Sequence, residues 1–315
     1  MGDMVHNLPV VADLHAAVSD CRIEWVVEEA FSAIPRMHPH VERVIPVTGR
    51  RWRKYPFTAR TREEIRDLRR RLRQTQYDYI IDTQGLLKSA LLAWMANGQS
   101  HGLDWNSSRE PLRIFYDRVH AVPWSVHAVQ RNRLLASKAL GYPISETPDY
   151  GITANPDNTA ALESAFSLQR AGEFAVLLHA TSAMKKEWPE NNWVQLGERL
   201  ASRGMISVLP FGNEVEQARS NRLASRISGA RVPPALSLDL LATLMSQARI
   251  VVGVDTGLTH LAVALNRPTI GLYCATDPAA TGLFGSPRAL NLGGIGLIPS
   301  VNEVAGALQR LVEVI

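Results

Sequence analysis

The 315-residue sequence has only two cysteines, Cys21 and Cys274, and both lie in apolar surroundings far apart in the chain. We expect them to be small buried hydrophobic side chains, and not a structural disulfide or a zinc site. Long apolar runs are also missing, because the longest are far shorter than the roughly 18 residues that a membrane span needs. No N-terminal segment resembles a signal peptide. These absences favour a cytoplasmic protein in a reducing compartment.

The composition is that of a globular protein, with 46% hydrophobic and 20% charged residues. The length is about twice that of a typical domain of ~150 residues, which predicts two domains. A break rich in turn residues, Gly141 to Pro148, lies near the middle. We therefore expect domains over 1–150 and 151–315.

The positive charge is concentrated in one segment. Residues 50–73 hold eleven Lys or Arg against three acidic residues, a local charge of +8 in a chain whose total is +4. The remainder of the protein is therefore mildly acidic. The segment either binds an anionic partner or forms a solvated helix face.

Apolar runs of strand length alternate with segments of helical periodicity, which is typical of parallel sheets covered by helices on both faces. In the first half this pattern predicts helices over 6–18, 62–74, 86–95 and 126–140, and strands over 23–27, 43–47 and 77–82. In the second half it predicts these: strands 174–179, 206–211, 250–254 and 269–273, with helices near 192–202, 214–227, 237–247 and 257–264. The fold class is therefore α/β, with two doubly wound, Rossmann-like domains that face a cleft.

Two loops of the second half have the chemistry of an anion site. Asp255-Thr256-Gly257 follows a buried strand and begins a helix, so Asp255 or Thr256 can cap it and the backbone amides can face a diphosphate. An ordinary capped turn explains the same residues equally well. The loop after residue 179 supplies hydroxyls and lysines suited to phosphate oxygens, although loop lysines are more often only solvated.

Two carboxylates are weaker candidates. Glu216, in the third such loop, can accept hydrogen bonds from ribose hydroxyls, or it can merely complement a helix dipole. Asp3, directly before the first predicted helix, can act as a general base or as an ordinary N-cap residue. Neither assignment follows from the local sequence alone.

Taken together, the motifs resemble one family. They are Gly2-Asp3 with His6 to Pro9, Asp82 to Ser89, Gly102 to Trp105, His127 to Asn132, Thr181 to Pro189 and Asp255 to His260. Their order and spacing resemble the ADP-heptose:lipopolysaccharide heptosyltransferases, more the heptosyltransferase I branch than heptosyltransferase II. The resemblance spans essentially the whole chain.

The resemblance implies a GT-B enzyme that moves L-glycero-D-manno-heptose from ADP-heptose to the first Kdo of Kdo2-lipid A, with inversion and without a metal or cofactor. It implies that Asp3 and Lys186 are catalytic. The donor residues that it implies are Thr181, Ser182, Lys186, Glu216, Asp255, Thr256, Gly257 and His260. The acceptor residues that it implies are Arg50, Arg51, Lys54, Gln84, Lys88 and Arg109. The enzyme is then expected at the cytoplasmic face of the inner membrane, in peripheral contact with its anionic surface.

Two alternatives remain open. One is a related GT-B transferase that uses another sugar nucleotide or acceptor, and the other is a non-enzymatic protein that binds nucleic acid through residues 50–73. The second is weaker, because only Trp52, Tyr55 and Phe57 interleave with the charges and no recognition motif follows. We expect no nucleic-acid partner.

The first motif also has an unusual setting. Every other predicted loop of this kind follows a buried strand, but none precedes Met1-Gly2-Asp3. In the resembling family about ten residues come before this methionine and form a central strand. We expect a natural chain that carries such a strand.

Overall fold

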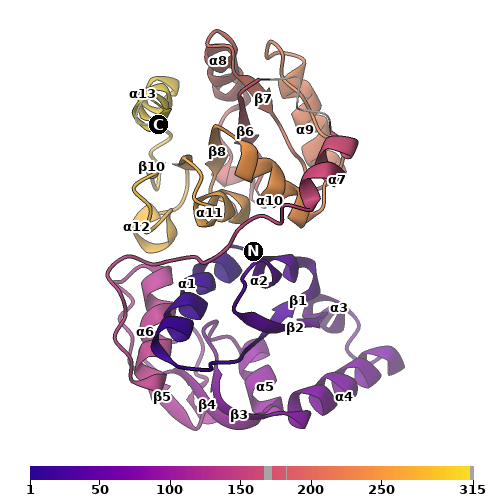
Figure 1. The fold of residues 1–315 in the computed structure, drawn as a ribbon, viewed down its shortest axis with the longest axis vertical. Helices are drawn as coiled ribbons and strands as arrows, with labels where there is room; N and C mark the ends of the chain where they lie inside the picture. The colour runs from indigo at the N-terminus through magenta and orange to yellow at the C-terminus, as the bar shows by residue number, and fades with distance from the viewer. Residues whose placement is uncertain (167–171, 182, 313–315) are drawn as a thin grey trace. The chain divides into compact units, whose positions relative to one another are not determined.

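The computed structural model describes residues 1–166, 172–181 and 183–312. The chain divides into two compact units (Figure 1). The N-terminal unit is His6–Asp149, and the C-terminal unit is Tyr150–Ile315 together with Met1–Val5. The first five residues thus group with the second half of the chain, although they begin a helix that continues into the first half.

The N-terminal unit alternates helices with parallel strands. Its helices are α1 (Gly2–Ala17), α2 (Ala33–Arg36), α3 (Gly49–Lys54), α4 (Ala59–Gln74), α5 (Leu87–Met95) and α6 (Ala128–Leu140), with 3-10 turns η1 (Glu29–Phe31) and η2 (Arg113–Phe115). Its strands are β1 (Ile23–Glu28), β2 (Val41–Val47), β3 (Gln76–Ile81), β4 (Asn97–Leu103) and β5 (Arg118–His120). The three predicted strands lie where expected, as β1, β2 and β3, and the four predicted helices correspond to α1, α4, α5 and α6. The elements α2, α3, β4 and β5 were not predicted.

The strands of this unit form two separate parallel sheets, β1-β2 and β3-β4-β5. Ile23 of β1 and Ile81 of β3 nevertheless pack on one apolar cluster with Val10 and Leu14 of α1. The apolar side chains of β1 and β3 are mostly only half-buried, whereas the three central strands of the other unit are completely buried. The strand expected upstream of Met1 stays a prediction.

The C-terminal unit holds one five-stranded parallel sheet in the order β10-β9-β8-β6-β7. Its strands are β6 (Phe174–Leu178), β7 (Ile206–Val208), β8 (Ile250–Val254), β9 (Thr269–Tyr273) and β10 (Ala289–Gly293). Its helices are α7 (Asn158–Ala165), α8 (Glu190–Ala201), α9 (Glu214–Ala224), α10 (Leu238–Gln247), α11 (Gly257–Ala264), α12 (Pro278–Thr281) and α13 (Val301–Val312), with the 3-10 turn η3 (Met184–Lys186). The bounds predicted for β8, β9 and α11 are confirmed.

The core of this unit explains why β6, β8 and β9 read as unbroken apolar runs. Parallel strands covered on both faces are buried on both faces, and all fifteen of these residues are buried. Two tryptophans, Trp188 and Trp193, complete the core with their rings 5.0 Å apart and edge to face. Trp188 also donates its indole N–H to the carbonyl oxygen of Pro299 across 2.7 Å, which fixes the loop that precedes it.

Candidate functional site

Strand order brings three loops of the C-terminal unit together. β8 lies between β6 and β9, with Leu178 in register with Gly253 and Val254 in register with Leu272. Because the three strands are parallel, their carboxyl ends share one edge of the sheet. The loops that follow them, beginning at His179, Asp255 and Cys274, therefore meet there.

Asp255 is the centre of this meeting point. Its Oδ2 atom accepts hydrogen bonds from Lys186 Nζ at 2.7 Å and from Thr276 Oγ1 at 2.8 Å. Its backbone carbonyl accepts one from Thr181 Oγ1 at 3.2 Å, and His260 Nε2 lies 3.9 Å from Oδ1. The predicted donor residues Thr181, Lys186, Asp255 and His260 are thus brought into one cluster. Thr276 was missed, because the sequence does not tell which strand lies beside which.

The electrostatics of the cluster favour an ionised carboxylate beside a cation. Burial alone raises the pKa of Asp255, but the polar contacts of His260, Lys186 and Thr276, with the positive charge of Lys186, outweigh it and hold the pKa well below its usual range. Asp255 therefore stays ionised at neutral pH, and it holds the Lys186 ammonium in the loop. An anionic ligand arriving here meets a positioned cation.

The start of α11 differs in detail from the expectation. Thr256 occupies the N-cap position but makes no side-chain cap hydrogen bond, and the Asp255 carboxylate binds Lys186 and Thr276 instead. The expected side-chain cap is therefore wrong, because the carboxylate binds the Lys186 ammonium and the Thr276 hydroxyl in place of the helix N–H groups. A Cβ at Gly257 would lie 2.5 Å from the Cβ atom of Met1, so only glycine permits this close approach.

Hydrogen bonds fix the loop after β6 on both sides of Lys186. Ser182 lies outside the described residues. His179 is fully buried, and its Nε2 atom lies 2.8 Å from Ser220 Oγ. On the other side, the Trp188 carbonyl accepts a hydrogen bond from Arg219 Nη2 at 2.9 Å, and Arg219 also pairs with Glu187. These contacts fix both ends of the loop that carries Thr181 and Lys186.

Glu216 lies in the first turn of α9, and its carboxylate has local partners. Oε2 accepts the backbone N–H of Gly212 at 2.8 Å, and Oε1 accepts Asn213 Nδ2 at 2.9 Å. Asn213 in turn caps the helix by accepting the N–H of Glu216 at 3.0 Å. The carboxylate thus holds the turn at the start of α9, while each oxygen keeps a lone pair for a further donor.

Asp3 lies in the first turn of α1, which begins at Gly2, and not before the helix as expected. The predicted start at residue 6 was too late, since the turn residues Gly2 and Asp3 are themselves helical. Met1 and Gly2 contact the first turns of α11, with a Cβ at Gly2 reaching within 3.8 Å of His260 Cδ2. The exposed Asp3 therefore follows directly on residues that touch the donor cluster.

The basic segment forms α3 and most of α4. Arg51 is paired with Glu64 and donates to Thr48 Oγ1 at 3.1 Å, so its guanidinium holds the two helices together. Hydrogen bonds from Trp52, Arg60 and Arg51 hold the pKa of Glu64 at about 2. Arg50 is exposed over the ring of Phe31, so it is more accessible to a ligand than Arg51.

The other predicted acceptor residues follow β3 and β4. The Gln84 N–H donates to Asp82 Oδ1 at 2.9 Å, and the buried Asp82 also accepts Tyr116 OH at 2.7 Å. Lys88 and Arg109 are both exposed. Arg109 follows a loop whose Ser107 carbonyl accepts Arg131 Nη2 at 2.7 Å. The buried Arg131, stacked 3.5 Å from the centre of the Trp124 ring, belongs to the motif His127 to Asn132, but the sequence analysis gave it no site role.

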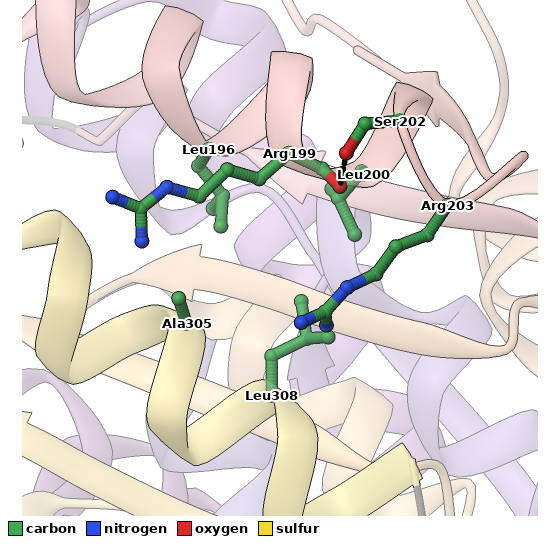
Figure 2. A pocket seen from close by; sticks show the side chains of 7 residues that line it. All are labelled: Leu196, Arg199, Leu200, Ser202, Arg203, Ala305 and Leu308. Carbon is green, nitrogen blue, oxygen red and sulfur yellow. Dashed lines mark hydrogen bonds between the residues drawn. The ribbon is translucent and has the colours of Figure 1, made fainter.

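A hollow elsewhere in the C-terminal unit contains none of these residues. It lies between α8 and α13, and Figure 2 shows Arg199 and Arg203 reaching across its apolar floor of Leu196, Leu200 and Leu308. The three leucines are buried packing residues of two adjacent helices, and the two arginines above them are exposed. We assign no ligand to it.

Two kinds of site are absent from the part of the chain that the structure describes. Within residues 1–166, 172–181 and 183–312, no helix has both the length and the apolar character needed to cross a bilayer. In the same ranges, His, Cys, Asp and Glu side chains do not gather in threes as a metal site requires. Both cysteines are free thiols; Cys274 is buried as expected, and Cys21 is half-buried.

The parallel α/β sheets and the loop cluster after β6, β8 and β9 fit an enzyme of the GT-B class, and comparison with known proteins makes the class specific. The model of glycosyltransferase family 9 (heptosyltransferase) matches residues 65–301. The chain belongs to this family and is a glycosyltransferase.

Several similar proteins are heptosyltransferases. Lipopolysaccharide heptosyltransferase 1 of Escherichia coli K12 is 43% identical over 288 residues, which cover 90% of this chain and 88% of that protein. The enzyme of the same name from Pseudomonas aeruginosa is 42% identical, over 90% of this chain and 79% of that protein. The solved structure of E. coli heptosyltransferase WaaC with ADP matches with a TM-score of 0.87 and 39% identity, covering 98% of this chain and 96% of that one.

Proposed function

We propose that the protein transfers L-glycero-D-manno-heptose from ADP-heptose to the first Kdo of Kdo2-lipid A, with inversion at the anomeric carbon. The observation that carries the proposal is the cluster of Thr181, Lys186 and His260 around Asp255. It lies in a chain 43% identical to heptosyltransferase 1 of E. coli. A similar structure is that of WaaC with ADP-2-deoxy-2-fluoro heptose, which supports ADP-heptose as the donor.

In this proposal the C-terminal unit binds the donor. Lys186 moves its positive charge from Asp255 towards the diphosphate, and the backbone amides at Thr256 and Gly257 face the same charge at the N-terminus of α11. Thr181 and Ser182 donate hydroxyl hydrogen bonds, and Glu216 accepts them from ribose. Leaving-group stabilisation then comes from the protein's own groups, without a metal ion or a cofactor.

The N-terminal unit binds the acceptor in this proposal. Arg50, Arg51 and Lys54, with Gln84, Lys88 and Arg109, contact the carboxylates and phosphates of Kdo2-lipid A, for which guanidinium groups are well suited. Asp3 removes the proton of the attacking Kdo hydroxyl, an effect that typically contributes 10²- to 10⁴-fold. The enzyme visits the cytoplasmic face of the inner membrane, where its acceptor lies, and it has no nucleic-acid partner.

Turnover with defined substrates tests the proposal. The purified chain is incubated with ADP-heptose or ADP-glucose, and with acyl-free Kdo2 acceptor either lacking or already carrying the first heptose. Release of ADP only with ADP-heptose and the unsubstituted acceptor is the expected result. Preference for the heptose-bearing acceptor would instead indicate a heptosyltransferase II activity, and no turnover with either acceptor would refute the assignment.

A further inference from the structure

Helix α5 exposes an apolar face. Leu87, Leu91 and Trp94 are 47%, 37% and 59% exposed, while Ala90 and Ala93 on another side of the helix are buried. The three exposed residues are spaced by four and three positions, so they lie on one face. An exposed helix face is normally polar. The only charged residue on this one is Lys88, beside Leu87.

Helix α4 carries a matching positive stripe. Arg62, Arg66, Arg69 and Arg73 are all exposed, and their spacing of four, three and four places them on one face of α4. The acidic side chains Glu64 and Asp67 are bound by other arginines, among them Arg60 and Arg70. Glu63, the third acidic residue of α4, is exposed beside Arg62, but the four arginines of the stripe outnumber it, so the face stays positive towards an outside partner.

The two stripes lie side by side. The Arg69 guanidinium is 6.0 Å from the centre of the Trp94 ring, and Arg73 Nε donates to the carbonyl oxygen of Met95 at 3.3 Å. Beneath them, Leu68 and Leu72 of α4 pack in one core with Leu92 and Met95 of α5. The surface made by Arg62, Arg66, Arg69, Arg73, Leu87, Leu91 and Trp94 is called the α4–α5 face below.

We propose that the α4–α5 face docks the enzyme on an anionic lipid bilayer. Leucine and tryptophan side chains suit the boundary between headgroups and acyl chains, and arginines beside them suit lipid phosphates. Charge complementarity favours a bilayer over a second copy, because a two-fold dimer through this face would bring the same positive stripes into one interface. The inference rests on the proposed function in one respect: the acceptor is a lipid, and Lys88 belongs both to α5 and to the proposed acceptor site.

Vesicle binding tests the docking apart from catalysis. The full chain, without donor or acceptor, is sedimented with vesicles of phosphatidylethanolamine and phosphatidylglycerol, and with neutral phosphatidylcholine vesicles. We expect binding to the anionic vesicles, weakening as salt rises from 0.05 to 0.5 M, since exposed charges are screened within about 8 Å at physiological ionic strength. Binding to neither kind of vesicle would overturn the proposal.

Two variants separate the apolar and the charged parts. Leu91→Gln with Trp94→Gln removes two exposed apolar side chains, and we expect it to weaken vesicle binding by about tenfold or more. Arg66→Glu with Arg69→Glu reverses two charges and should weaken binding by about tenfold or more at low salt. The matched controls are Ile295→Gln with Leu297→Gln, and Arg199→Glu with Arg203→Glu, all exposed in the C-terminal unit and expected to bind as the wild type does.

The outcomes distinguish this proposal from the proposed function. Both α4–α5 variants should keep wild-type turnover on acyl-free acceptor in solution and lose turnover only on acceptor embedded in vesicles. Unchanged vesicle binding in both variants refutes the docking face, as does a dimer in light scattering that the Leu91/Trp94 variant dissociates. If the wild-type protein bound anionic vesicles but turned over none of the acceptors, the proposed function would be refuted and the docking face would still stand.

Discussion

Lys186 Nζ donates to Asp255 Oδ2 across 2.7 Å, although the two residues are 69 positions apart in the chain. The pair forms because β6 and β8 are neighbours in the sheet and their loops leave the same edge. An ion pair in this place is only partly exposed, with 26% and 11% of the two side chains accessible. Asp255 thus positions a cation that an incoming diphosphate can share.

We expect Lys186→Ala to weaken ADP binding by about tenfold to a hundredfold, since hydrogen bonds to charged groups are worth about 1.5 to 3 kcal/mol. Titration calorimetry with ADP measures the change. The matched control is Lys185→Ala, because Lys185 is an exposed lysine of the same turn. Equal losses in the two variants would mean that general positive charge, and not the Asp255-held ammonium, binds the nucleotide.

The Asp3 variant tests the base. Asp3→Ala should lower the transfer rate by about a hundredfold or more and change donor affinity only a few-fold, because a base acts in the transition state and not in nucleotide binding. Rapid-quench turnover and ADP titration report the two quantities separately. Asp3→Asn serves as the matched variant, since it keeps the shape and loses the proton acceptor. Near-normal turnover in either variant would remove Asp3 from the mechanism.

The acceptor assignment predicts unequal roles for two adjacent arginines. Arg51 is held by Glu64 and Thr48, whereas Arg50 is exposed. Arg50→Glu should therefore raise the KM for acceptor several-fold with little change in melting temperature, and Arg51→Glu should lower the melting temperature as well. Steady-state kinetics at 0.05 and 0.3 M salt, with thermal unfolding of each variant, measure both effects. An unchanged acceptor KM in Arg50→Glu would make this cluster a solvated face.

The sequence predicted best those strands whose burial is visible in their own residues. Strands β8 and β9 are buried on both faces, so their uniform apolar runs between polar turns predicted their bounds. Strand β4 was missed because its sequence, NGQSHGL, has neither an apolar run nor regular alternation. Gly98 and Gly102 in it accommodate Tyr77 and Tyr116 at distances that no Cβ tolerates. Strand β4 therefore depends on tertiary packing, which the strand propensity of its own residues does not predict.

In the candidate site, too, contacts between distant segments could not be predicted from the sequence. Lys186 and Asp255 were identified separately, each at a strand end, and the resemblance grouped them. Their direct contact depends on the strand order β9-β8-β6, and so does the hydrogen bond from Thr276 to Asp255. No single segment of the sequence determines that order. The exposed apolar face of α5 could not be predicted for a different reason. The run from Leu87 to Met95 is apolar, and such a run does not tell whether the helix is buried or exposed.

The last prediction concerns acid stability. Burial, and then the charges of Arg219 and Arg222 against the opposing charge of Glu190, lower the pKa of His179 to about 4. In the unfolded chain the same imidazole titrates near its usual value of about 6.5. Between these two values the unfolded state binds the extra proton, so the free energy of unfolding should fall as the pH drops from about 6.5 to 4 and should not respond to His179 above that range.

The expected contribution is about 3 kcal/mol at the acid end, since each pKa unit corresponds to about 1.4 kcal/mol. His179→Gln should keep a polar group near Ser220 Oγ, 2.8 Å from the present Nε2, and remove the titration. Urea unfolding of both proteins at pH 7, 6, 5 and 4.5 measures the difference. The variant should lose less stability on acidification than the wild type, although His38, whose pKa burial also lowers to about 4, still contributes in both proteins. Parallel curves for the two proteins would show that His179 does not stay neutral in the fold, and that another group causes the acid sensitivity.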